Sequence, residues 1–258
     1  MQVMTEPKLK IPPAAKRSGG CLHVGRPGHG DRKMFDRLVD EMFARSRFTN
    51  NGELVRELES RLRDHLGVRH CILTSNGTLA LQLAIRALGL AGEVIVPAFT
   101  FPATVHALQW EGIRPVFADI DPLTHNLDPA SVESLITGRT RGILGVHVWG
   151  RPCQPDVLGK IAAAHDLTLL FDAAHAFGSA YQQKMIGNFG RCEVFSFHAT
   201  KFFHTFEGGA LVTNDDHLAA RLHLMRNFGF SGCDTVVALG INAKMPEVCA
   251  AMGLAHLS

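Results

Sequence analysis

Lys201 is the residue on which the chemistry of this sequence centres. It follows a short apolar run, residues 193–197, that predicts a buried strand, and it lies beside Phe202, Phe203 and Phe206. A lysine among aromatic side chains is poorly solvated, so its charged form is disfavoured and its amine becomes a better nucleophile. A Schiff-base lysine needs such an environment. The alternative is a lysine whose methylene stem covers the phenyl rings while its amine reaches water.

A second feature is the glycine-containing turn at residues 74–78 (TSNGT), between a predicted strand and a predicted helix. The free backbone N–H groups and the positive dipole end at such a helix N-terminus suit a phosphate. The alternative is an ordinary helix N-cap made by Ser75 or Asn76.

Two further candidates follow predicted strands, and ligands of open α/β sheets bind beyond the carboxyl ends of the strands. Phe101 could stack on a planar ring, with a place in the core as the alternative. Asp172 ends a very apolar strand, where a carboxylate is costly unless a cation pairs with it; a cap or turn residue is its alternative. His175 lies three residues after Asp172, and Ser196 lies five residues before Lys201.

These features together match the needs of one cofactor. Pyridoxal 5′-phosphate requires a phosphate cup, a ring platform, an acid beside its pyridinium nitrogen and a Schiff-base lysine. The sequence supplies a candidate for each: the 74–78 turn, Phe101, Asp172 and Lys201.

The elements that would position these residues alternate regularly between strands and helices. Apolar strands separated by helices indicate a mostly parallel sheet covered on both faces. We therefore expect one α/β domain with about seven strands. Strands are predicted at residues 70–74, 93–96, 115–120, 142–148, 167–171 and 193–197 and after Gly208; helices at 33–45, 53–66, 78–88, 102–110, 129–136 (with Asp128 as N-cap), 155–165, 215–228 and 246–257.

The composition and the motifs that are missing argue against several classes of function. Hydrophobic residues make up 46% of the 258 residues, enough for a large core, and the net charge of +2 gives no reason to expect a nucleic acid. No apolar run is long enough to cross a membrane. The 6 cysteines are scattered, which suggests reduced packing residues and a cytoplasmic protein. No metal-ligand spacing is found among the histidines, and the residues around Gly28 lack the third glycine and preceding strand of a dinucleotide fingerprint.

The two ends of the chain carry separate expectations. Residues 1–20 are rich in lysine and proline and are interpreted as a mobile tail. The predicted helix at 246–257 is so apolar that something must cover it, which suggests a missing second domain or a partner subunit.

Four segments carry a resemblance to the DegT/DnrJ/EryC1/StrS family of pyridoxal-phosphate-dependent nucleotide-sugar aminotransferases, which have fold type I. They are residues 74–81 (TSNGTLAL), 96–101 (VPAFTF), 171–178 (FDAAHAFG), and 196–201 (SFHATK) with Gly208 and Gly209 after Glu207. Residues 22–27 (LHVGRP) and 49–52 (TNNG) resemble the branch that aminates dTDP-4-dehydro-6-deoxy-D-glucose at C4.

The resemblance implies a role for each matching position. Lys201 would form the Schiff base and shuttle the proton, and Asp172 would pair with the pyridinium nitrogen. His175 stands where many members have a glutamine near the ring hydroxyl. The remaining cofactor contacts would be Phe101 on the ring and Gly77, Thr78 and Ser196 on the phosphate, with Asn242 reaching the phosphate of the neighbouring subunit of a homodimer.

The resemblance also implies an activity. The chain would transfer an amino group from an amino acid, L-glutamate in the family, to a nucleotide-linked 4-keto-6-deoxy sugar. A dehydratase subgroup has histidine in place of the lysine, so the intact Lys201 favours amination. Family members continue into a C-terminal small domain, so we expect residues 21–258 to be the cofactor-binding large domain, with the small domain absent. The alternative is a shortened, non-catalytic cofactor-binding or regulatory protein of the same fold.

Overall fold

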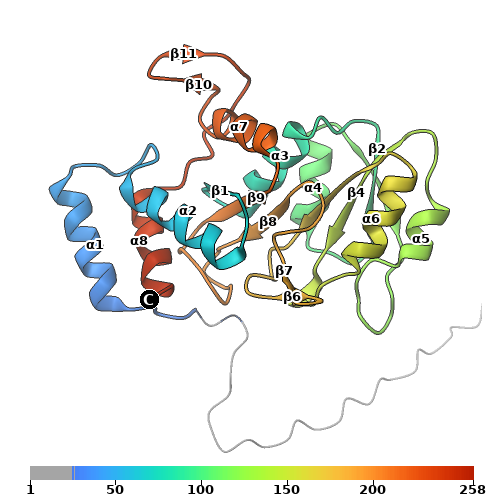
Figure 1. The fold of residues 1–258 in the computed structure, drawn as a ribbon, viewed down its shortest axis with the longest axis horizontal. Helices are drawn as coiled ribbons and strands as arrows, with labels where there is room; N and C mark the ends of the chain where they lie inside the picture. Colours follow the sequence, from blue (N-terminus) through green and yellow to red (C-terminus); the bar gives the residue numbers. More distant parts are fainter. Residues whose placement is uncertain (1–24, 26) are drawn as a thin grey trace, which may run out of the picture.

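The fold is built on a seven-stranded sheet with the strand order β1-β9-β8-β5-β4-β2-β3 (Figure 1). The computed structural model describes Gly25 and residues 27–258, so the predicted tail at residues 1–20 lies outside the described residues. Neighbouring strands are parallel except around β9, which is antiparallel to both β1 and β8. The strands are β1 (His70–Thr74), β2 (Glu93–Pro97), β3 (Arg114–Ala118), β4 (Thr140–Val146), β5 (Thr168–Asp172), β8 (Glu193–Ser196) and β9 (Gly209–Thr213).

Helices cover both faces of this sheet, as the apolar strands predict. Side chains of β5 show why: Leu170 packs with the cluster under α3, α4 and α7, whereas Leu169 and Phe171 pack with the cluster under α5 and α6. The helices are α1 (Arg32–Ala44), α2 (Glu53–Leu66), α3 (Gly77–Ala87), α4 (Pro102–Trp110), α5 (Pro129–Ser134), α6 (Pro155–Ala164), α7 (Asp216–Met225) and α8 (Glu247–His256).

The predicted mostly parallel α/β sheet is therefore confirmed, with element ends displaced by a few residues. The sequence reading missed three short elements: the hairpin of β6 (Ala180–Tyr181) and β7 (Lys184–Met185), the hairpin of β10 (Phe230–Ser231) and β11 (Thr235–Val236), and the 3-10 turn η1 (Val148–Gly150). Two-residue strands carry no readable alternation of apolar and polar residues, so a periodicity argument does not detect them.

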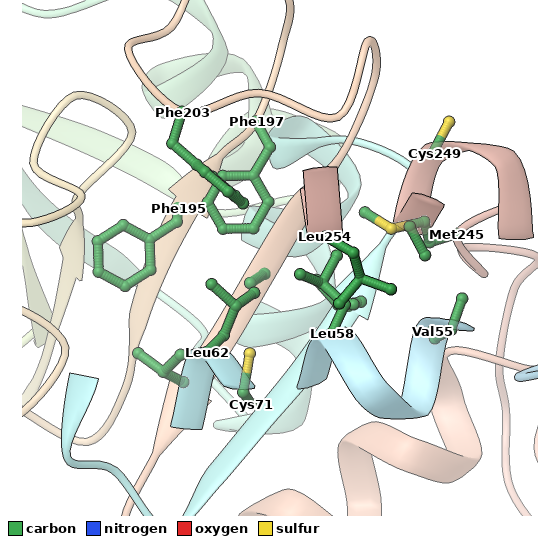
Figure 2. Close-up of a cluster of buried hydrophobic side chains, with 14 of the residues drawn as sticks. Val55, Leu58, Leu62, Cys71, Phe195, Phe197, Phe203, Met245, Cys249 and Leu254 are labelled. Carbon is green, nitrogen blue, oxygen red and sulfur yellow. The ribbon is translucent and has the colours of Figure 1, made fainter. Parts of the chain in front are cut away.

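Helix α8 corrects one expectation. It packs against α1 and α2, and most of its residues are buried. Figure 2 shows Leu254 of α8 facing Leu58 of α2 within a cluster that also contains Phe197 and Phe203. The cover that an apolar helix requires is thus supplied by this chain's own first two helices, and its apolarity is no argument for a partner.

Glu247 ties α8 to the start of α2. The N-cap residue of α2 is Gly52, which has no side chain to accept the free N–H groups of the first turn. The Glu247 carboxylate accepts them instead, with Oε2 at 2.9 Å from the Leu54 nitrogen and Oε1 at 3.3 Å from the Val55 nitrogen. A Cβ at Gly52 would lie 2.5 Å from Glu247 Cδ, so only glycine leaves room for this cap. Burial raises the pKa of Glu247, while the backbone hydrogen bonds oppose that rise.

Within residues 27–258 no helix has the length and apolarity needed to span a bilayer. The same residues contain no group of three or more His, Cys, Asp or Glu side chains arranged to hold a metal ion.

We predict that Glu247→Ala lowers the free energy of unfolding by about 1–3 kcal/mol, because it leaves buried N–H groups of α2 without acceptors. Urea denaturation followed by circular dichroism measures this change. Glu133→Ala, at an exposed position of α5, is the matched control and should change stability by less than about 0.5 kcal/mol. Equal effects of the two substitutions would show that the cap contributes nothing.

Candidate active site

The register of the sheet brings the predicted site residues to one edge. Thr74 and Ser196, which end β1 and β8, both pair with Gly209 at the start of β9. Asp172, which ends β5, pairs with Val146 of β4 and with Val194 of β8. The carboxyl ends of the parallel strands thus meet around Asp172, where open α/β sheets bind ligands.

Asp172 is buried, with 5% of its surface exposed, and is held by two neutral donors. The hydroxyl of Thr104 donates to Oδ2 at 2.7 Å, and the Ala174 N–H donates to Oδ1 at 3.0 Å. The Thr104 hydroxyl has one proton and donates it to Asp172. In the 2.8 Å contact between the two threonine hydroxyls, Thr100 is therefore the donor and Thr104 the acceptor. Asp172 therefore does more than cap the turn, since Thr104 comes from α4, far away in the sequence. No cation within residues 27–258 forms a salt bridge with it.

Lys201 lies in the turn after β8, half-buried, with its N–H donating to the His198 carbonyl at 2.8 Å. Burial lowers the pKa of Lys201, and the negative charge of Asp172 partly opposes that shift. The predicted direction of this pKa shift and its predicted cause, poor solvation, both agree with the structure, but the neighbouring rings are placed differently from the prediction. Phe202 is 88% exposed, whereas Phe203 packs on Phe197 in the core, with ring centroids 4.9 Å apart. Phe203 therefore anchors the turn in the core, and Phe202 does not.

The turn before α3 has the shape of an anion cradle. Asn76 is the N-cap, and its side chain accepts only the Leu79 N–H, at 2.8 Å. The N–H groups of Gly77 and Thr78, in the first turn, have no acceptor within the helix. A Cβ at Gly77 would lie 3.1 Å from the Ser196 Cβ, and one at Gly209 would lie 2.7 Å from the Gly77 nitrogen. The two glycines thus let β8 and β9 pass directly beneath the turn and bring Ser196 beside it. The N-cap alternative and the anion site are therefore compatible. Asn76 accepts the Leu79 N–H and leaves the N–H groups of Gly77 and Thr78 free for an anion.

A cavity of about 230 Å³ lies at the carboxyl ends of β2, β4 and β5. Its lining includes Phe101, Asp172 and His175. Phe101 is 72% exposed at the N-cap of α4, so the alternative that it belongs to the core is wrong. Its ring is free to cover a ligand that reaches Asp172.

His175 and Asn242 lie at the surface. Partial burial and the charge of Lys201 lower the pKa of His175, whereas Asp172 raises it, which shows that the three charges share one neighbourhood. Asn242 is exposed and forms an isolated bridge with Asn227. The next residue, Ala243, accepts the Ser75 N–H at 2.9 Å, so this segment runs against the cradle of its own chain.

The sequence reading missed several residues of this site. Thr104 holds Asp172, yet a threonine in a short apolar helix carries no sign of that contact. Trp149 lines the cavity from η1, and its backbone has a positive φ of 54°. One feature of the sequence could have identified Trp149 as a site residue: like Phe101, it follows a predicted apolar strand.

The chain is similar to known proteins in both sequence and fold. A profile of the DegT/DnrJ/EryC1/StrS aminotransferase family matches residues 30–258. The dTDP-4-amino-4,6-dideoxy-D-glucose transaminase of Shigella dysenteriae is 41% identical over 236 residues, covering 92% of this chain and 64% of that protein. The solved structure of DesI in the presence of its TDP-sugar product has a TM-score of 0.87 and 52% identity, covering 92% of this chain and 60% of that chain.

A third comparison involves a bound cofactor. NtdA from Bacillus subtilis, solved with the cofactor PMP, has a TM-score of 0.80 and 30% identity, covering 88% of this chain and 52% of that chain. This chain thus spans less than two thirds of the length of each of the three proteins.

We predict that Asp172→Asn lowers the pKa of Lys201 further. The carboxylate stabilises the ammonium form, so its removal leaves the opposing effect of burial uncompensated. The pH dependence of Lys201 acetylation by acetic anhydride, followed by peptide mass spectrometry, measures this pKa. Lys160, exposed on α6, serves as an internal control, and Asp156→Asn as a matched variant away from the site. An unchanged or higher Lys201 pKa in Asp172→Asn would contradict the electrostatic pairing.

Proposed function

This chain belongs to the DegT/DnrJ/EryC1/StrS aminotransferase family, and on that premise we propose that it is the cofactor-binding part of a pyridoxal-phosphate-dependent sugar aminotransferase. The observation that carries the proposal is the arrangement around Asp172. A lysine with a lowered pKa, a buried carboxylate and an anion cradle meet at one edge of the sheet.

The residues present fit pyridoxal 5′-phosphate. The cradle at Gly77 and Thr78 offers backbone N–H donors and the positive end of α3 to a phosphate, with the Ser196 hydroxyl beside it. The Asp172 carboxylate keeps lone pairs beyond those used by Thr104 and Ala174. Phe101 and His175 border the same cavity. Each part of the cofactor thus has a chemically matching group in this chain.

Each residue then has a defined task. When bound, pyridoxal 5′-phosphate supplies an electron sink for the carbon that bears the amine. Lys201 Nζ would hold the cofactor covalently, and once displaced by an incoming amine it would act as a base and carry a proton from donor to acceptor. Its lowered pKa keeps more of the amine unprotonated near neutral pH. Asp172 would hold a proton on the ring nitrogen, a role for which its fixed carboxylate is positioned by Thr104.

The substrates we propose are an amino acid donor, L-glutamate, and a nucleotide-linked 4-keto-6-deoxy sugar as acceptor. Support comes from the transaminase of Shigella dysenteriae, whose name specifies a dTDP-linked 4-amino-4,6-dideoxy sugar, and from DesI with its TDP-sugar product. The intact Lys201 favours amination because dehydration in this family uses a histidine there.

We further propose that the chain acts as a homodimer, with residues 21–258 as the large domain. Asn242 is exposed beside the 228–241 segment, which carries the exposed apolar side chains of Val236 (61%) and Leu239 (70%). In Figure 1 the β10–β11 hairpin projects away from the sheet and helices, a position from which it can reach a second copy. A cytoplasmic location is supported by the buried, unpaired thiols of Cys71, Cys153 and Cys192.

The test is a half-reaction with the amine donor. Cofactor-loaded protein mixed with L-glutamate should release about one equivalent of 2-oxoglutarate, and further turnovers should require the keto sugar. Lys201→Ala should slow this release by about 10²-fold or more, because the proton carrier is lost. Lys160→Ala, on the exposed face of α6, is the control and should react normally. Bound cofactor without 2-oxoglutarate would instead indicate the non-catalytic binder, and absence of cofactor binding would contradict both readings.

A further inference from the structure

Three aromatic rings form a rim beside the cavity that contains Asp172. They are Phe99, His125 and Trp149, with centroids 5.8 Å apart for Phe99 and His125, 5.6 Å for Phe99 and Trp149, and 5.1 Å for His125 and Trp149. Phe99 and Trp149 line the cavity and are 42% and 67% exposed. None of the three is among the residues proposed to bind the cofactor or to carry the proton. Their position beside the cavity therefore indicates a different role.

The rim is held in place at a cost in backbone strain. His125 and Trp149 both have left-handed backbones, with φ of 59° and 54°. Histidine enters this region fairly often, whereas a bulky residue such as Trp149 adopts it only when its surroundings enforce it. Strain of this kind clusters at ligand-binding sites and is kept where geometry serves function. An exposed Trp149 and a half-buried His125, held side by side in left-handed turns, therefore indicate a surface shaped for a ligand.

Asn126 holds the backbones of His125 and Trp149 in place. It is buried, with 4% of its surface exposed. Its Oδ1 accepts the Val148 N–H at 3.0 Å, and its Nδ2 lies 3.2 Å from the Arg151 carbonyl and 3.3 Å from the Pro152 carbonyl. One side chain thus fixes the turn that carries His125 to the loop that carries Trp149.

A second contact fixes that loop to the catalytic side. The Ser179 hydroxyl donates to the Gly150 carbonyl at 2.9 Å. A Cβ at Gly150 would lie 2.7 Å from the His175 carbonyl oxygen, so the loop after Trp149 lies directly against the backbone of His175. The rim and the proposed cofactor site consequently share one rigid wall.

We propose that this rim is the subsite for the hexose ring of the nucleotide sugar, with the apolar face of the ring stacked on Trp149 and its edge against Phe99. The proposal rests on the proposed function. The sugar carbon that receives the amine must approach the group held by Asp172 and Lys201, whereas the nucleobase is separated from that carbon by the ribose and the diphosphate. The ring nearest Asp172 is therefore the hexose. Its C–H bonds suit the electron-rich face of an aromatic ring, and a 6-deoxy sugar adds an apolar methyl group.

The test uses binding alone, so it needs neither cofactor nor turnover. Isothermal titration with dTDP-glucose, and with dTDP as the probe lacking a hexose, compares the wild type with Trp149→Ala and Trp149→Phe. We expect Trp149→Ala to weaken dTDP-glucose binding about two- to tenfold and leave dTDP binding unchanged, with Trp149→Phe recovering most of the loss. Circular dichroism confirms that the variants are folded.

Tryptophan fluorescence gives an independent measurement. The chain has 2 tryptophans, and Trp110 lies on α4 outside the cavity that contains Asp172. In a Trp110→Phe background the emission therefore reports Trp149, and it should change with dTDP-glucose beyond any change with dTDP. Equal weakening for both probes in Trp149→Ala, no weakening for either, or no dTDP-glucose binding by the wild type would each overturn the proposal. Loss of the 2-oxoglutarate half-reaction with this binding pattern intact would instead count against the proposed function only.

Discussion

The site depends on the balance of charge between Asp172 and Lys201. Burial disfavours the ammonium form of Lys201, and the Asp172 carboxylate partly restores it. The carboxylate in turn stays in place because a threonine hydroxyl and a backbone N–H hold it. A lysine that loses its proton readily, beside a fixed negative charge that can engage a cationic ring, is the arrangement that amine transfer needs. The cradle, Phe101 and the aromatic rim lie around the same edge of the sheet as this pair.

The topology explains why these groups meet. Parallel strands end at a common edge, so the turns after β1, β2, β4, β5 and β8 converge although they are spread over about half of the chain. The antiparallel strand β9 also helps to position the site. It starts at this edge, and Gly209 lets its backbone pass beneath the first turn of α3. The residue that ends β8, Ser196, is thereby placed against the anion cradle rather than away from it.

Sequence reasoning recovered the sheet, its covering helices and the residue types at its edge, because buried strands, helix caps and lone polar residues leave local signals. It could not recover contacts between distant segments. The cap that Glu247 gives to α2, the cover of α8 by α1 and α2, and the support of Asp172 by Thr104 join segments far apart in the chain. The same limit applies to Lys201: adjacency in sequence suggested that Phe202 and Phe203 surround the amine, whereas Phe202 is 88% exposed and Phe203 packs in the core. Trp149 and His125 were not predicted as site residues, because the residue type does not reveal that their backbones are left-handed.

The most direct test of the central claim is to find which lysine bonds to the cofactor. The protein is incubated with pyridoxal 5′-phosphate and treated with borohydride, which reduces the C=N bond and fixes the label, and the labelled peptide is identified by mass spectrometry. We predict a label concentrated at Lys201, with Lys33 and Lys160, which are not part of the site, essentially unmodified under limiting cofactor. A label spread over the exposed lysines, or absent from Lys201, would contradict the assignment of this sheet edge as the active site.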